Sequence, residues 1–255
     1  MEYLKIKISV VQFQRDGKFK QNIEKIDTLL GNIKDSDFIL LGGEFSINES
    51  SRENPYPAIK KLSQKYDANI VAPVNANLER FPNLKSKGRS SIQIIDRKGK
   101  VIAIQDKQHF YFKERAWFMK GSKIQVFEVE GIKIGLIRGL DLFYPEYTRK
   151  LMDAELCFVS TMAVDNMMLE LAKIRALENI SYFVMSSFIG QFVGMDFIGN
   201  AAIIEPQAII KKGMRFQNQV KTLVHSQDEG FYETEIDIAH IRKLKGIFPY
   251  EETNY

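Results

Sequence analysis

Two charged residues stand at predicted strand ends, where their side chains could take part in catalysis. Glu44 lies near the end of the apolar run FILLGGEF, and the carboxyl edge of a sheet is where α/β proteins place their ligand crevices. Partial burial there would suit this carboxylate to general base work. Lys107 ends the run KVIAIQDK, just before the aromatic run HFYF, and an ammonium held there could stabilise an oxyanion. Each residue alone also has a structural interpretation, as a helix cap for Glu44 and as a solvated lysine for Lys107.

Glu114 is a third charged candidate. It opens the stretch ERAWFMKG, residues 114–121, which we interpret as a helical turn with Trp117 and Phe118 packed inward. Its ordinary role would be helix capping or an ion pair. Because the three candidates are far apart along the chain, only the fold can bring them together.

The stretch IKIGLIRGLDLFYPE, residues 132–146, predicts a buried strand, a tight turn and the start of a helix. Turns of this kind often carry a catalytic nucleophile. Here Arg138, Gly139 and Leu140 occupy the turn, and none of them can attack a carbon. The single cysteine, Cys157, lies inside the next apolar run, ELCFVST, and we interpret it as a buried core residue.

The elements around these residues alternate strand and helix in the first third of the chain, which is typical of an α/β sheet. Helices are predicted over 22–33, 57–66, from about 145, and over 165–180, and strands over 37–45, 69–75, 155–161, 181–188 and 230–237. Hairpins are predicted with turns at 97–100 and 130–131, and a third within 201–213. Hairpins among strand–helix units indicate a mixed sheet rather than a doubly wound dinucleotide fold. We expect one domain over 1–255, with little pattern in the tail from about 247.

Cofactors, metals, nucleic acid and membranes are all disfavoured by the sequence. It has no GxxxxGK[ST] or GxGxxG loop, and its three histidines are widely separated, so neither a cofactor nor a metal site is expected. A net charge of +4 without long single-sign runs does not indicate a nucleic-acid groove. No apolar run approaches the roughly 20 residues of a membrane span, and the chain opens on a strand pattern, so we expect a cytoplasmic protein.

The order of the motifs resembles the nitrilase (carbon–nitrogen hydrolase) superfamily. The resemblance is carried by a Glu after the first strand–helix–strand unit, by a Lys followed by E-x-x-x-F-x-x-G, and by a strand–turn–helix ending in D-x-x-x-P-E. These are Glu44; Lys107 with 114–121; and the stretch from Asp141 to Glu146. The stretches IRALEN, GNAAIIEPQAII and ETEID resemble the later family motifs, so the resemblance covers nearly the whole chain.

This resemblance implies an α/β fold, a four-layer α-β-β-α sandwich with mixed sheets, that pairs into a homodimer or a higher even oligomer. It also implies a Glu-Lys-Cys triad with a second Glu, in which the Cys forms a thioester with an amide or nitrile carbon. Carried over, Glu44 resembles the base, Lys107 the oxyanion lysine and Glu114 the second glutamate. The nucleophile position, two residues before Asp141, is Gly139 and is therefore vacant.

Three functions are compatible with a family member whose nucleophile position is occupied by glycine. The first is a pseudoenzyme that binds a small polar ligand, an amide or a carboxylate, with Arg138 and Asp141 as further ligand-binding residues. The second is a hydrolase in which Glu44 activates a water, which is a poorer nucleophile than a thiolate. The third is a structural subunit of a mixed oligomer. Glycine beside an unexpected Arg138 resembles natural drift more than a designed inactivation.

Overall fold

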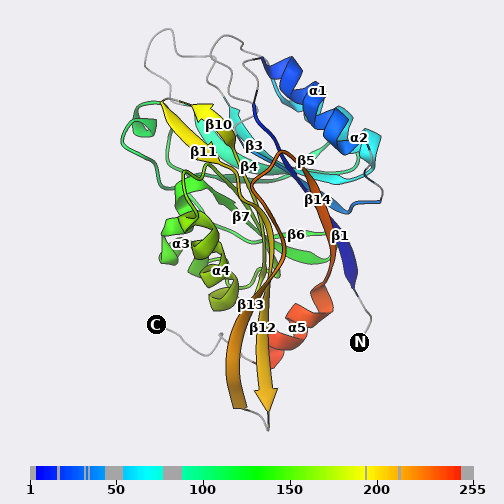
Figure 1. Ribbon diagram of the computed structural model, residues 1–255, viewed down its shortest axis with the longest axis vertical. Helices are drawn as coiled ribbons and strands as arrows, with labels where there is room; N and C mark the ends of the chain where they lie inside the picture. Colours follow the sequence, from blue (N-terminus) through cyan, green and yellow to red (C-terminus); the bar gives the residue numbers. More distant parts are fainter. Residues whose placement is uncertain are drawn as a thin grey trace.

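The computed structural model describes residues 4–15, 18–31, 33, 35–43, 54–76, 88–192, 194–211 and 214–247, with the backbone alone at 76, 208–211 and 214–218. Glu44 and the tail after 247 lie outside the described residues. Within them, the chain folds into two six-stranded sheets, a short hairpin and a set of flanking helices (Figure 1).

The first sheet has the strand order β14-β1-β2-β3-β4-β5. Strands β1, β2 and β3 are parallel, and the other neighbours are antiparallel. Their bounds are β14 (Gly230–Asp237), β1 (Lys5–Gln12), β2 (Phe38–Leu41), β3 (Asn69–Ala76), β4 (Arg89–Ile95) and β5 (Val101–Asp106). The turn between β4 and β5 confirms the first predicted hairpin, and β14 closes the sheet as expected.

The second sheet has the order β13-β12-β9-β8-β7-β6, with β7, β8 and β9 parallel. Its strands are β13 (Met214–Ser226), β12 (Ala201–Lys211), β9 (Tyr182–Ser187), β8 (Leu156–Thr161), β7 (Ile132–Arg138) and β6 (Phe127–Val129). Glu130 and Gly131 both have positive φ and make the turn of the second predicted hairpin. A separate hairpin pairs β10 (Ile189–Phe192) with β11 (Met195–Ile198).

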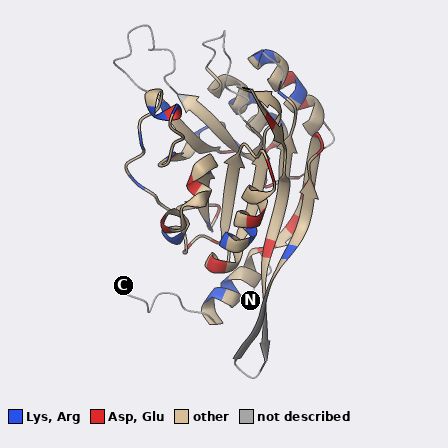
Figure 2. Ribbon diagram, turned by 60° about the vertical axis from the view of Figure 1, so that its left-hand side comes forward, with Lys and Arg blue, Asp and Glu red and all other residues tan. Residues whose placement is uncertain are grey.

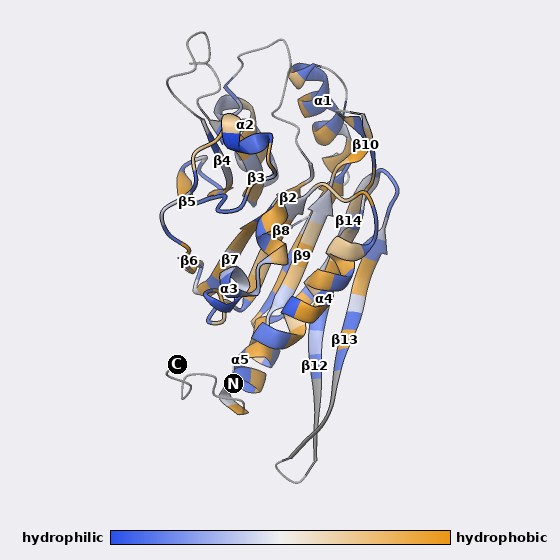
Figure 3. Cartoon of the chain, turned by 90° about the vertical axis from the view of Figure 1, so that its left-hand side faces the viewer, coloured by the Kyte–Doolittle hydropathy of each residue, from blue (hydrophilic) through white to orange (hydrophobic). Residues whose placement is uncertain are grey.

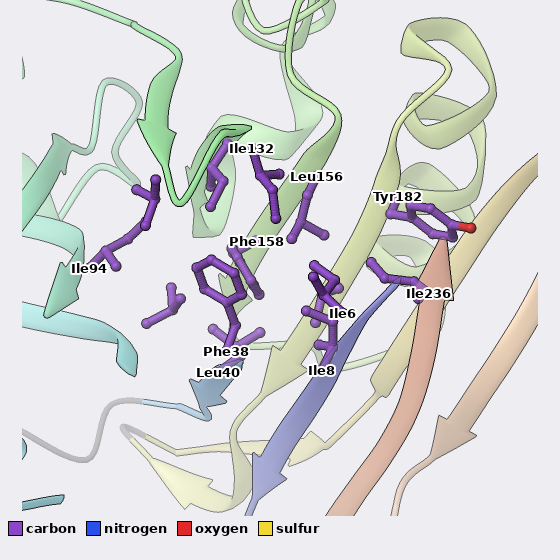
Figure 4. Close-up of a cluster of buried hydrophobic side chains, with 14 of the residues drawn as sticks. Ile6, Ile8, Phe38, Leu40, Ile94, Ile132, Leu156, Phe158, Tyr182 and Ile236 are labelled. Carbon is purple, nitrogen blue, oxygen red and sulfur yellow. The ribbon is translucent and has the colours of Figure 1, made fainter. Parts of the chain in front are cut away.

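Three apolar clusters hold the layers together. One lies between the two sheets (Figure 4), where alternate residues of β7 such as Ile134 and Leu136 meet residues of β1 and β2. The second packs α1 (Phe19–Leu30) and α2 (Tyr56–Tyr66) on the first sheet. The third packs α3 (Pro145–Arg149) and α4 (Met167–Asn179) on the second sheet. The resulting order of helix, sheet, sheet and helix confirms the expected four-layer sandwich (Figure 1), and Figure 3 shows α4 lying over the face of the second sheet.

Two details of the expected structure are wrong. Residues 201–211 form one continuous strand, which pairs with β13 as far as Lys211 and extends beyond the layers (Figure 1), rather than a hairpin of their own. Pro206 does not break this strand because β12 pairs with β9 only over 202–204, so the ladder beyond has a free edge. In addition, Trp117 is 49% exposed, whereas Phe118 is buried as predicted.

Positively and negatively charged residues are interspersed over the helices and outer strands (Figure 2). Ion pairs of the described residues include Arg97 with Glu130 and Arg242 with Glu155. Across the described ranges, no helix is both long and apolar enough to cross a bilayer.

Lys245, on α5 (Ile238–Ile247), makes stability depend on pH. Its ammonium donates to the carbonyls of Met152 and Asn179, and burial lowers the pKa of Lys245 from 10.5 to about 8. Between these values the unfolded chain binds more protons than the folded one, so the free energy of unfolding rises with pH. We expect Lys245→Met to remove about 2 kcal/mol of this rise across the window. Urea unfolding at pH 8 and pH 10.5 measures this rise in the free energy of unfolding. Lys243→Met, at an exposed lysine of the same helix, is the control. Equal pH dependence in the native protein and in Lys245→Met would contradict the prediction.

Candidate active site

Lys107 and Glu114 form a close ion pair at the end of the first sheet. Lys107 directly follows β5, and its side chain is almost entirely buried, with the residue 5% exposed. Its Nζ lies 2.7 and 2.8 Å from the two carboxylate oxygens of Glu114. Glu114 begins the 3-10 helix η2 (Glu114–Ala116), and its Oε2 also accepts a hydrogen bond from the backbone N–H of Tyr111. The ammonium is therefore held in one place by a carboxylate that is itself fixed.

Gly139 lies against this ammonium. It follows β7 at the start of the 3-10 helix η3 (Gly139–Phe143) and has a φ of +53°, a conformation that favours glycine. A Cβ on Gly139 would lie 3.4 Å from the Nζ of Lys107 and 3.6 Å from its Cε. Around that point, among the described residues beyond its chain neighbours, no other heavy atom comes within 4 Å. A small side chain at Gly139 would therefore fit and would face the ammonium.

Asp141 ties the turn of Gly139 to the segment that carries Lys107. It is fully buried, and its carboxylate accepts hydrogen bonds from the backbone N–H groups of Gln108 and His109. The Nδ1 of His109 lies 2.9 Å from Oδ1 of Asp141. Burial raises the pKa of Asp141 while these bonds lower it, and burial is the larger effect. The role that the structure shows for Asp141 is thus to link two loops.

Sequence reasoning missed this linkage. An equal spacing in the sequence could have indicated this linkage. His109 stands two residues after Lys107, and Asp141 stands two residues after Gly139. The imidazole ring of His109 also stacks on Tyr144, with ring centroids 3.5 Å apart and an interplanar angle of 10°.

Arg138 is buried at the end of β7 and is only 2% exposed. It pairs in register with Ser160 of the neighbouring strand β8, and its Nη1 lies 3.3 Å from the hydroxyl oxygen of Ser160. Ser160 in turn pairs with Ser186 of β9. The carboxyl end of the second sheet is therefore polar, where apolar residues fill the rest of these strands.

The first sheet meets this polar end at Gly42, just after β2. A Cβ on Gly42 would lie 2.3 Å from the hydroxyl oxygen of Ser186 and 2.5 Å from the carbonyl oxygen of Val11, so only glycine allows this approach. Gly43 is the last described residue before residue 54, so Glu44, the expected base, lies outside the described residues. The structure thus brings Lys107, Glu114 and Gly139 together and leaves Glu44 undetermined.

Cys157 does not belong to this site. It is fully buried in the cluster beneath α3 and α4, beside Gly135. Burial raises the pKa of the Cys157 thiol to about 12, so a thiolate is strongly disfavoured there. The prediction that Cys157 is a core residue is confirmed.

Comparison with known proteins adds to this geometry. The family model described as Carbon-nitrogen hydrolase matches residues 7–229. A probable nitrilase of Schizosaccharomyces pombe is 29% identical over 175 residues, which cover 66% of this chain and 63% of that protein, so the match spans less than two thirds of its length. The 2-oxoglutaramate amidase of Bacillus subtilis is 24% identical over 270 residues and 96% of each chain. Among solved structures, Saccharomyces cerevisiae Nit3, a member of branch 10 of the nitrilase superfamily, is similar with a TM-score of 0.77 and 17% identity over 98% of this chain and 96% of that chain.

Proposed function

Because the chain belongs to the carbon–nitrogen hydrolase family, we propose that it is an amidase-like member that lacks the nucleophile and binds a small polar amide or carboxylate beside Gly139. The observation that carries this proposal is the 3.4 Å between Lys107 Nζ and the position of a Cβ on Gly139. In the triad that the family resemblance implies, a thiol on this Cβ would attack the substrate carbon. Glycine cannot form that bond, so no acyl-enzyme arises.

The retained groups suit binding. The ammonium of Lys107 is already oriented by Glu114 and can donate a hydrogen bond to a carbonyl or carboxylate oxygen, an interaction that is stronger for a charged donor. Arg138, directly before Gly139, adds positive charge at the carboxyl end of the second sheet. We assign Glu44 as the base position, and we assign Asp141 to the positioning of Lys107 instead of direct ligand contact, since its oxygens already accept bonds from the chain.

The remaining features of the proposal come from the resemblance. We propose that the chain forms one domain, acts in the cytoplasm and assembles as a homodimer or a higher even oligomer. The 2-oxoglutaramate amidase of Bacillus subtilis, which matches 96% of this chain, makes small oxo-acid amides a first class of ligand to try.

The test is a panel of small amides and the corresponding carboxylates, with ammonia release and thermal unfolding measured together. The native protein is expected to release no ammonia above the spontaneous rate and to gain stability, by about 2.7 kcal/mol when the ligand is at 100 times its Kd. This gain should disappear in Lys107→Gln and persist in Lys113→Gln, an exposed lysine nearby.

Other outcomes would overturn the proposal in favour of the alternatives. Ammonia release by the native protein that is abolished in Glu44→Gln would show a hydrolase with Glu-activated water. Absence of both release and stabilisation across the panel would favour a structural subunit.

A further inference from the structure

A second pocket, of about 480 Å³, lies beside the segment that follows Lys107. Lys107, Glu114 and Gly139 do not line it, so it is separate from the site described above. Its volume is within the range of small-molecule sites, about 300–1,000 Å³. None of its described lining residues is an Asp or a Glu.

Flat aromatic side chains make its walls. His109 and Tyr144 stack with centroids 3.5 Å apart, and Phe110 and Phe118 lie nearly parallel at 6.0 Å and 14°. All four line the pocket. The His109 ring is fixed from behind, because its Nδ1 is bound to the buried carboxylate of Asp141. The His109 part of the wall is therefore held in place before a ligand arrives, which lowers the entropic cost of binding.

Two cations complete the lining. Arg115, from η2, and Lys120 are exposed residues at the pocket, and they bring two positive charges to its lining. Aromatic walls alone would accept any planar ring, and two cations alone would accept any small anion. The combination selects a ring that carries a negative charge.

We propose that this pocket binds a small aromatic carboxylate, with the ring against the aromatic walls and the carboxylate at Arg115 and Lys120. This inference does not rest on the proposed function, since Lys107, Glu114 and Gly139 do not line the pocket; the two places share only Asp141, which holds the His109 ring. No chemical step is involved, because the pocket holds its ligand without altering it.

Trp117, the single tryptophan of the chain, provides a direct readout because it stands between Arg115 and Phe118 in the sequence. Titration of the native protein with benzoate is expected to give a saturable change in tryptophan fluorescence. Benzamide, which keeps the ring and loses the charge, and acetate, which keeps the charge and loses the ring, should each bind about tenfold more weakly or worse. Line broadening of the benzoate proton resonances in the presence of the native protein gives a second measurement that needs no variant.

Single substitutions locate the binding. Arg115→Gln and Lys120→Gln should each weaken benzoate about tenfold, and Tyr144→Leu about fivefold through the lost stacking. Lys113→Gln, the matched exposed control, should bind as the native protein does. The proposal is overturned if benzamide binds as tightly as benzoate, or if Lys120→Gln keeps native affinity. It is equally overturned if benzoate binding is lost in Lys107→Gln alone, since the ligand would then occupy the other site.

Discussion

Gly139→Cys is expected to convert the protein into a working amidase. Ammonia release from small amides should rise at least about a hundredfold above the native protein, since loss of a catalytic nucleophile typically costs far more than this factor. The reason is geometric: the new Cβ would lie 3.4 Å from Lys107 Nζ, where the ammonium can stabilise the thiolate and then the oxyanion. Steady-state ammonia release measures the gain.

Matched variants separate a restored nucleophile from a general change in the site. Gly139→Ala adds the same Cβ without sulfur and should remain inactive. Both variants share the strain of a side chain at a φ of +53°, a cost of about 1 kcal/mol, so their unfolding curves should agree. In the Gly139→Cys background, Lys107→Met should lower the rate about a hundredfold by removal of one oxyanion donor. Equal rates for Gly139→Cys and Gly139→Ala would contradict the prediction.

Lys107→Met is the second change with a large expected effect, because it removes the charge and nearly preserves the volume. The carboxylate of Glu114 would lose its ion pair, and since the Glu114 side chain is 27% exposed, water can compensate only in part. We expect a loss of about 2 kcal/mol in the free energy of unfolding, together with loss of ligand binding beside Gly139. Urea unfolding and the thermal shift with ligand measure the two effects.

The double variant Lys107→Met/Glu114→Gln separates stability from binding. In the double variant, position 114 carries a neutral amide, which does not need a cationic partner. The double variant should therefore recover part of the lost stability, while ligand binding stays absent. Lys113→Met should leave both quantities unchanged. Native stability and native ligand binding in Lys107→Met would show that the ion pair neither stabilises this loop nor contacts the ligand.

The individual strands and turns were largely predictable because their signals are local, whereas the four-layer arrangement was implied by the family resemblance. Apolar runs of four to eight residues bounded by turn residues gave β7, β8 and β9, and the turns at 97–100 and 130–131 carry glycine where a positive φ is required. The exposure of Trp117 was not predictable from pattern, because η2 spans only 114–116 and is too short for a helical periodicity. The continuity of β12 through Pro206 depends on the limited pairing with β9, which is a tertiary property.

The sequence could nominate residues for the candidate site, but it could not predict the contacts between them. Strand ends and the order of motifs pointed to Lys107, Glu114 and Gly139. The approach of Gly139 to Lys107, and the linkage through Asp141, join segments that come from different sheets. Such contacts depend on how the two sheets pack, so no local pattern encodes their distances.

The most direct measurement is the intact mass of Gly139→Cys after brief incubation with a small amide, followed by peptide mapping. We predict a mass increase of one acyl group, located in the peptide that contains residue 139, and no modification of Cys157 or of the native protein. An unmodified variant, or an acyl group found on any other residue, would contradict the claim that Gly139 occupies the position of the nucleophile.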